Sequence, residues 1–198
     1  ICEIGSGWGQ CCEILNQYNK KLNFLNSYTS IDLEETLILS YLNACFNYNN
    51  DIKLINDNEF KKFNFCTPEN IQYIFKKGKY FDIFINWYSF QEMTKKNVKG
   101  YIELIKKTLK PGGLFLSSNS WGEKYEIKQF SDLLLHNFEI VNIFKDGRSP
   151  AGNQQLVVVC KNVKNNKKVD IDKLNKNALL LKNTDTLTTE QFLKNIYS

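Results

Sequence analysis

The chain has 198 residues, of which 42% are hydrophobic and 14% aromatic, so it can build the core of one domain. Its 26 basic and 21 acidic side chains leave a net charge of +5, and the lysines are spread along the chain, which argues against nucleic-acid binding. No apolar run approaches the roughly 18 residues of a membrane span, so we expect none. Six cysteines without a C-x-x-C pair, and a single histidine, predict free thiols in a reducing cytoplasm and no structural metal.

Residues 1–9 have the order of a strand, a glycine turn and the start of a helix. Glu3 lies near the end of a short apolar run, and an amphipathic stretch opens at Gln10. Three glycines stand between them at alternate positions: Gly5, Gly7 and Gly9. Glycines allow a ligand to approach the backbone closely and can take positive φ without a Cβ clash, and a helix N-terminus presents free N–H groups. The turn is therefore a candidate ligand site, and a tight turn without a ligand is the alternative. A dinucleotide fingerprint would need glycine where Gln10 stands.

A helix and a second strand are expected after the turn. Residues 10–19 can form a helix whose predicted apolar stripe is Ile14, Leu15 and Tyr18. Residues 27–32 are rich in β-forming side chains and end at Asp32, about 20 residues past the turn. At this distance the terminal carboxylate of a second strand can accept both hydroxyls of a ribose. The alternative is that Asp32 caps the next helix.

The alternation of helices and strands continues to residue 93. A helix is predicted over 34–46, and its apolar side chains at helical spacing are Leu37, Ile38, Tyr41, Leu42 and Cys45. Of two strand-like stretches, 52–55 and 63–66, we favour the second as the third core strand. Residues 80–86 form a near-continuous apolar strand, as is typical of the centre of a parallel sheet. Polar side chains gather where this strand stops, at the end that faces a ligand crevice in such sheets: Asn86, Ser89, Gln91 and Glu92.

The remaining three strands of the sheet are predicted from residues 98–160. The expected elements are a helix over 98–109 that stops at Pro111-Gly112-Gly113, a strand over 114–119, a helix with Ile127, Phe130 and Leu134 inward, and strands over 138–144 and 155–160. Residues 162–198 change composition and are interpreted as a polar tail or linker after a domain formed by residues 1–161. The chain begins inside a core strand, so we expect an N-terminal part of this domain to be missing.

These pieces together resemble the class I S-adenosylmethionine-dependent methyltransferases over residues 1–161. The likeness rests on E-x-G-x-G-x-G at residues 3–9, on Asp32 after the second strand, on strand 81–86 with its polar end, and on L-K-P-G-G-L-F at residues 109–115. The resemblance implies an α/β fold with a doubly wound, mostly parallel seven-stranded sheet and an antiparallel terminal strand. It also implies S-adenosyl-L-methionine as cofactor, bound by Glu3, Gly5, Ser6, Gly7, Gly9, Asp32, Leu33 and Asn86.

A narrower likeness lies in residues 89–93, which read S-F-Q-E-M. This segment resembles the sugar O-methyltransferases found in bacterial surface-polysaccharide gene clusters, and Asn119 is similar to an Asn that ends the fifth strand in that group. The resemblance implies a sugar or nucleotide-sugar acceptor. No cluster of carboxylates in the sequence suggests a metal site, so none is expected, although the sequence does not determine metal dependence. We expect Glu92 to be the general base, because a sugar hydroxyl has a high pKa. Its alternative role is that of an acid at a helix N-terminus. Ser89, Gln91 and Asn119 are expected to bind sugar hydroxyls.

Other functions are separated from this one by particular residues. A nucleic-acid amino-methyltransferase would need a proline-containing segment after strand 80–86, and residues 86–89 contain no proline. Two alternatives stay open: a methyltransferase that acts on another small molecule, and a non-catalytic binding module of the same fold. Neither the identity of the sugar nor the oligomeric state follows from the sequence.

Overall fold

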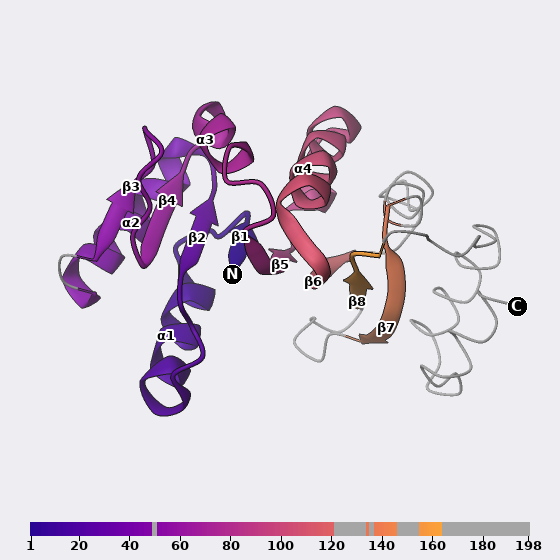
Figure 1. The fold of residues 1–198 in the computed structure, drawn as a ribbon, viewed down its shortest axis with the longest axis horizontal. Coiled ribbons are helices and arrows are strands. Elements are labelled where there is room, and N and C mark those ends of the chain that lie inside the picture. Colours follow the sequence, from indigo (N-terminus) through magenta and orange to yellow (C-terminus); the bar gives the residue numbers. More distant parts are fainter. Residues whose placement is uncertain (49–50, 121–133, 135–136, 146–154, 164–198) are drawn as a thin grey trace, which may run out of the picture.

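The computed structural model describes residues 1–48, 51–120, 134, 137–145 and 155–163, and Figure 1 shows their arrangement. The strands are β1 (Cys2–Ile4), β2 (Tyr28–Ile31), β3 (Ile52–Leu54), β4 (Phe63–Cys66), β5 (Phe81–Trp87), β6 (Leu109–Ser120), β7 (Glu139–Lys145) and β8 (Gln155–Lys161). The α-helices are α1 (Gln10–Leu22), α2 (Glu34–Asn47), α3 (Ile71–Phe75) and α4 (Lys95–Thr108), and the 3-10 turns are η1 (Pro68–Asn70) and η2 (Phe90–Glu92).

All the strands belong to one sheet with the order β3-β4-β2-β1-β5-β6-β8-β7. The strands from β3 to β6 pair in parallel, and β8 pairs antiparallel with both β6 and β7. From β1 the chain builds the sheet first toward β4 and later toward β6. The sheet therefore has a topological switch point between β1 and β5, where open α/β sheets bind ligands beyond the strand ends.

The expected α/β fold and the antiparallel last strand are confirmed, but the expected number of seven strands is wrong. The described sheet has eight strands, because both candidate stretches after α2 are strands. The favoured stretch, β4, lies inside the sheet beside β2, and β3 adds an edge strand beyond it.

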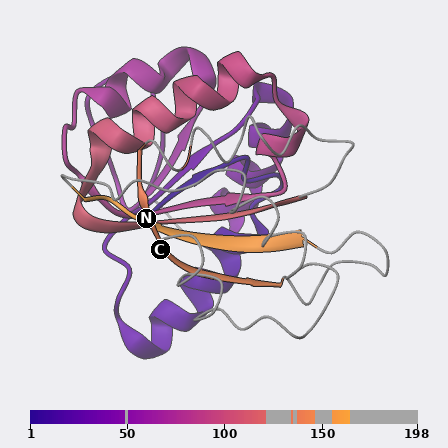
Figure 2. The same ribbon diagram turned by 90° about the vertical axis from the view of Figure 1, so that its right-hand side faces the viewer.

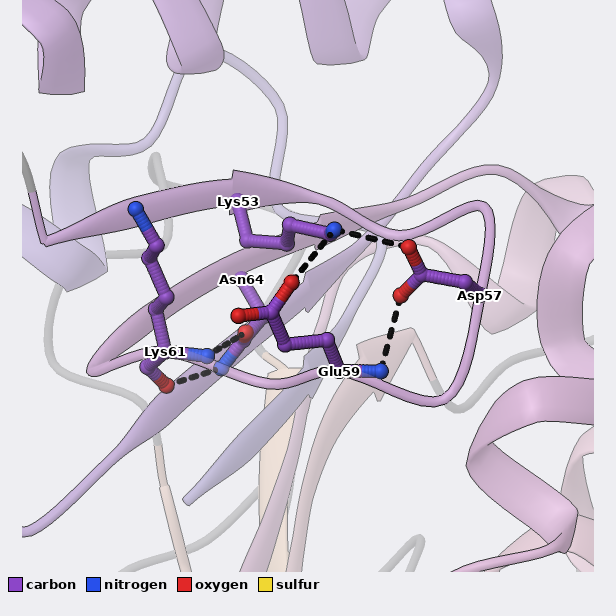
Figure 3. Close-up of polar contacts among 5 residues, drawn as sticks. All are labelled: Lys53, Asp57, Glu59, Lys61 and Asn64. Carbon is purple, nitrogen blue, oxygen red and sulfur yellow. Dashed lines mark hydrogen bonds and ion pairs between the residues drawn. The ribbon is translucent and has the colours of Figure 1, made fainter.

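The edge strand β3 is joined to β4 by a short connection, residues 55–62, whose contacts are shown in Figure 3. Lys53 donates to Asp57 at 2.8 Å and to Glu59 at 3.1 Å. The Asn64 side chain accepts from the backbone N–H of Lys61 and donates to its carbonyl, both at 2.7 Å. These bonds satisfy polar groups in a connection that is too short to contain a crossover helix. The charged side chain of Lys53 on the edge strand also disfavours pairing of β3 with another chain.

The two faces of the sheet carry different helices. Cys2, Ile4 and Ile31 pack in one core cluster with side chains of α3 and α4, such as Ile74 and Ile102. Tyr28, Phe63 and Phe65 pack in a second cluster with Cys12 of α1 and Leu37 of α2. Figure 2 shows the sheet nearly edge-on, with α4 in rose above it and α1 in indigo below it. The period-two alternation of side chains along each strand produces this separation.

The buried face of α1 differs from the predicted apolar stripe. Ile14 is 44% exposed and Tyr18 57% exposed, whereas Cys12, Asn16 and Asn19 are buried. The Asn19 Oδ1 accepts from the backbone N–H of Leu25 at 2.6 Å and so satisfies a buried donor after the helix. The prediction for Ile14 and Tyr18 was wrong. The helix starts directly at the glycine turn, which fixes which side chains face the sheet, and its inner face carries Asn19, which binds the backbone of Leu25 after the helix.

The inner face of α2 is formed by small side chains. Leu37 is buried as expected, but its buried neighbours are Ser40 and Ala44, and Ile38 and Leu42 are exposed. A Cβ placed on Gly9 would lie 3.0 Å from the Ser40 Cβ, so the glycine turn and α2 approach each other closely. This close approach favours a small side chain at position 40.

The Pro111-Gly112-Gly113 segment lies within β6 rather than only ending α4. The helix ends at Thr108, and Leu109 already pairs with Phe81 in the sheet. The pairing then jumps to Leu114 opposite Ile83, so the Pro-Gly-Gly segment forms an irregularity in the strand, with a φ of 79° at Gly112.

Several predictions fall outside the described residues. One is the helix expected to bury Ile127, Phe130 and Leu134: Ile127 and Phe130 are not among the described residues, and Leu134 is described and buried. Strand β8 ends at Lys161, and the expected tail lies almost wholly outside the description, so the domain boundary stays a prediction. Among the described helices, none has the length and apolar character that a membrane span requires.

Candidate functional site

The predicted site residues come together at the carboxyl ends of four neighbouring strands. Ile4 of β1 pairs with Ile31 of β2 and with Asn86 of β5, and Asn86 pairs with Ser117 of β6. The segments that follow these strands therefore meet at one edge of the sheet, at the switch point. They are the glycine turn, the Asp32–Leu33 pair, the turn after β5 and the end of β6.

The glycine turn has the backbone that its spacing predicted. Gly5, Gly7 and Gly9 have φ values of 74°, 55° and 89°. The N–H of Gly5 donates to the carbonyl of Ile31 at 2.8 Å, which joins the turn to the end of β2. A Cβ on Gly5 would meet the Ser89 side chain, whereas a Cβ on Gly7 would meet no atom within 4 Å. Gly5 is therefore enclosed by the protein, and Gly7 faces open space.

Asp32 binds the glycine turn directly. Its Oδ2 accepts from the backbone N–H of Gly7 at 2.7 Å, and its Oδ1 accepts from that of Leu33 at 2.8 Å. Burial raises the pKa of Asp32, and these two N–H donors counteract part of that rise. Helix α2 has Leu33 as its N-cap and no side-chain cap, so Asp32 does not have the capping role considered as its alternative. Leu33 is 61% exposed beside it.

Glu3 and Ser6 lie below the turn in the protein interior. Both are buried, and each is hydrogen-bonded to a residue of β2: the Tyr28 hydroxyl donates to Glu3, and the Ser30 hydroxyl donates to Ser6. Burial raises the pKa of Glu3 to about 7; the hydrogen bond from Tyr28 lowers it, and the charge of Asp32 raises it further. Glu3 therefore changes charge near neutral pH.

The turn after β5 is held by side chains that were expected to face ligands. The Asn86 Nδ2 donates to the carbonyl of Ile4 at 3.0 Å and also to the Ser89 hydroxyl. That hydroxyl in turn lies 3.2 Å from the same carbonyl. Tyr88 has a φ of 62°, and its N–H donates to the carbonyl of Ser118 at 2.7 Å. The inner half of the turn is thus bound to β1 and β6.

The outer half of the turn carries the predicted acceptor-side residues. Glu92 is exposed on η2, and Gln91 beside it is half-buried. Helix α4 begins after its own cap, Thr94, so Glu92 does not belong to the first turn of that helix. Asn119 is only 2% exposed and lies behind Gln91, whose N–H donates to its Oδ1 at 3.2 Å. The structure therefore exposes Glu92 at the site and encloses Asn119.

Sequence reasoning missed the side chains that support the site from the neighbouring strands: Tyr28, Ser30, Ser40 and Ser117. Tyr28 and Ser30 are two residues apart on β2, so their common face was readable, but their partners 25 and 24 residues away were not. In the part of the chain that the structure describes, no three metal-binding side chains of His, Cys, Asp or Glu lie together.

Comparisons with the sequence alone find no matching protein-family model and no matching curated protein. Solved structures do match. An S-adenosylmethionine-dependent methyltransferase from Methanosarcina mazei shares 15% identity with a TM-score of 0.57, covering 82% of this chain and 91% of that one. The N-methyltransferase NodS from Bradyrhizobium japonicum shares 16% with a TM-score of 0.57, covering 82% and 85%.

Two further structures show the range of proteins that share this architecture. The magnesium protoporphyrin IX methyltransferase from Synechocystis, with S-adenosylmethionine bound, has 12% identity and a TM-score of 0.57, covering 81% of this chain and 68% of that one. The cyclase SpnF has 13% identity and a TM-score of 0.58, covering 82% and 74%. The chain therefore has the fold of the class I S-adenosylmethionine-dependent methyltransferases. A fold shared with a cyclase does not by itself define the reaction.

Proposed function

We propose that the protein binds S-adenosyl-L-methionine at the switch point and transfers its methyl group to a small-molecule acceptor. The observation that carries the proposal is the contact of the Asp32 carboxylate with Gly7 at 2.7 Å. This contact brings a carboxylate to Gly7, a glycine that has positive φ and open space beside it, at the carboxyl ends of β1 and β2. The shared fold supports the proposal.

The residues of the turn fit such a cofactor. Each oxygen of a carboxylate has two acceptor positions, and each Asp32 oxygen uses one of them for a backbone N–H. The remaining two positions suffice for the hydroxyls of a ribose. Leu33 offers an exposed apolar surface to the adenine ring, and the open space beside Gly7 admits the cofactor chain. Glu3, buried below the turn, supplies negative charge for the ammonium group when it is ionised.

The reaction asks little of this chain besides positioning. When bound, S-adenosylmethionine supplies a methyl group on a sulfonium whose departure leaves a neutral thioether. The residues after β5 then have to hold an acceptor in line with the methyl group, since orientation is the main source of acceleration in such a displacement. Glu92 is exposed on η2, where it can take the proton that the acceptor hydroxyl loses as its oxygen–carbon bond forms.

For the acceptor we propose the hydroxyl of a sugar or nucleotide-sugar, as part of surface-polysaccharide synthesis in the cytoplasm. Its support is the S-F-Q-E-M segment at residues 89–93 and the exposure of Glu92 within it. The tests are a transfer assay with methyl-labelled cofactor against sugars and nucleotide-sugars, and the variant Glu92→Gln. We expect this variant to lower kcat about 100-fold or more and to leave cofactor affinity unchanged. Glu69→Gln, which changes the exposed acid of the other 3-10 turn, is the matched control. Near-normal turnover by Glu92→Gln would remove Glu92 from the role of base.

Replacing Asp32 with alanine is expected to raise the Kd for S-adenosylhomocysteine about 100-fold. The variant loses two hydrogen bonds to a charged group, each contributing about 1.5 kcal/mol or more, and frees the N–H of Gly7. Isothermal titration measures the change. Asp57→Ala is the control, because Asp57 is an exposed loop aspartate that binds Lys53 on the far edge of the sheet (Figure 3). A Kd within threefold of the unmodified protein for Asp32→Ala would contradict the ribose role. Tight binding without transfer to any acceptor would favour the binding module.

A further inference from the structure

Two buried amide side chains join neighbouring strands at the floor of the site. Asn86 ends the inner part of β5 and is fully buried, and Asn119 lies near the end of β6 with 2% exposure. The Asn119 Nδ2 donates to the Asn86 Oδ1 at 2.8 Å. A buried pair of amides is stable only if its remaining donors and acceptors also find partners. The other hydrogen bonds of Asn86 and Asn119 therefore indicate their role in the site.

The bonds of both amides can be counted atom by atom. The second N–H of the Asn119 Nδ2 donates to the Ser117 hydroxyl at 2.8 Å. The two N–H groups of Asn86 donate to the Ile4 carbonyl and to the Ser89 hydroxyl. Both amide nitrogens therefore use all their donors within the protein.

The orientation of each amide follows from its fixed partners. A rotated Asn86 would place its oxygen against the Ile4 carbonyl, and a rotated Asn119 would place its NH₂ against the N–H of Gln91. Either rotation sets two like groups against each other in the interior, which is unfavourable. The Asn119 Oδ1 is thus directed at the turn after β5.

The turn after β5 is attached to β6 at two points. One is the bond from the Tyr88 N–H to the Ser118 carbonyl at 2.7 Å, next to the positive φ of Tyr88. The other is the bond from the Gln91 N–H to the Asn119 side chain at 3.2 Å. Between them, Ser89 contacts Gly5 of the glycine turn. The second attachment lies directly before Glu92, so it sets where that carboxylate stands.

We propose that Asn119 is a positioning residue, which holds η2 and Glu92 in place through the N–H of Gln91 and does not touch the acceptor. This inference rests on the proposed function and replaces the sugar-binding role that the sequence predicted for Asn119. A chain of hydrogen bonds runs from Ile4 through Asn86 and Asn119 to Gln91. This chain of hydrogen bonds therefore links β1, which precedes the glycine turn, to the turn after β5, which carries the candidate base Glu92.

Amide hydrogen exchange of Gln91, followed by NMR, tests the positioning role without any assay of transfer. In the unmodified protein we expect Gln91 to exchange at least 100-fold more slowly than in an unstructured peptide. Asn119→Asp retains an acceptor for Gln91 but, when ionised, sets a carboxylate against the Asn86 oxygen. We expect Gln91 exchange, corrected for its intrinsic pH dependence, to be at least tenfold faster than in the unmodified protein at pH 8. At pH 5 we expect it to return to within threefold, because the protonated carboxyl again donates to Asn86.

A matched control separates this effect from a general loss of stability. Asn64→Asp also places a carboxyl at a fully buried asparagine, in β4 away from the site. We expect it to leave Gln91 exchange within threefold of the unmodified protein at both pH values. Gln91 exchange in Asn119→Asp that matches this control at pH 8 would overturn the proposal. If Asn119→Asp does not fold, unprotected exchange of Gln91 in the unmodified protein would overturn it as well.

Kinetics then distinguish positioning from contact with the acceptor. For Asn119→Asp we expect at least a tenfold lower kcat at pH 8, with the acceptor KM and the Kd for S-adenosylhomocysteine within threefold of the unmodified protein. A tenfold higher KM with unchanged kcat would mean that Asn119 binds the acceptor and would overturn the proposal. Failure of the unmodified protein to bind S-adenosylhomocysteine would instead overturn the proposed function, and the exchange of Gln91 would still decide whether Asn119 holds the turn.

Discussion

Gly5→Ala is expected to lower the free energy of unfolding by about 2–5 kcal/mol and to abolish measurable binding of S-adenosylhomocysteine. An alanine at the φ of 74° found at Gly5 costs about 1–2 kcal/mol. The new methyl group would also meet the Ser89 side chain, and overpacking of this kind costs about 1–3 kcal/mol more. Relief of the contact would move the glycine turn away from the turn after β5 and distort the cofactor site. Urea denaturation and isothermal titration measure the two effects.

Two further variants separate backbone strain from the contact with Ser89. Gly78→Ala has a comparable φ of 66° with no atom within 4 Å of the new Cβ, so we expect only the cost of strain. Ser89→Gly removes the opposing side chain, and in its background Gly5→Ala should cost at least about 1 kcal/mol less than in the unmodified protein, because the lost bond from Asn86 to Ser89 is then common to both proteins compared. Equal destabilisation by Gly5→Ala and Gly78→Ala would show that Gly5 and Ser89 are not in close contact.

The unmodified protein is expected to lose about 3 kcal/mol of stability between pH 4.5 and 7.5 through the titration of Glu3. The pKa of this buried carboxyl is raised from 4.5 to about 7, mainly by desolvation. Between these values the folded state holds a proton that the unfolded state has released, so stability falls as the pH rises. Each unit of pKa difference corresponds to about 1.4 kcal/mol. The stability that protonated Glu3 contributes is fully present below its pKa in the unfolded chain, 4.5, and is lost as the pH rises through its pKa in the folded protein, about 7.

Glu3→Gln removes this ionisation and keeps an oxygen that accepts the hydrogen bond from Tyr28. We therefore expect the variant to lack the Glu3-dependent fall in stability and to exceed the unmodified protein most clearly at pH 8. Urea denaturation at pH 5, 6, 7 and 8 gives the difference between the two proteins. Glu13→Gln, an exposed position on α1, serves as the control. A difference between Glu3→Gln and the unmodified protein that is independent of pH would show that Glu3 does not titrate in this range.

The parts of the site that were predictable from the sequence depend on neighbours along the chain. The alternation of three glycines predicted positive φ at Gly5, Gly7 and Gly9, and all three have it. Asp32 was expected at the site because it ends the second strand about 20 residues past the turn, and the structure brings its carboxylate into contact with Gly7. The cofactor and acceptor roles of these residues stay proposals, whereas their meeting is a feature of the structure.

The predictions that were wrong concern which face of a helix packs against the sheet. Ile14 and Tyr18 have helical spacing, yet α1 buries Asn16 and Asn19 instead, because Asn19 binds a backbone donor after the helix. On α2, Ser40 is buried against the glycine turn, where a Cβ placed on Gly9 would lie 3.0 Å from the Ser40 Cβ. Nothing in the local pattern shows such partners, because they arrive from other segments.

The sequence by itself determined the α/β alternation, the glycine turn and the carboxylate after β2, because dihedral preferences and side-chain periodicity act within a few residues. Only the tertiary structure decided that β3 joins the sheet, that Glu3 is paired with Tyr28, and that Asn119 faces Gln91. Those contacts join residues 25 and 28 positions apart, or strands at a sheet edge. They depend on strand order and register, which form only when the whole core packs.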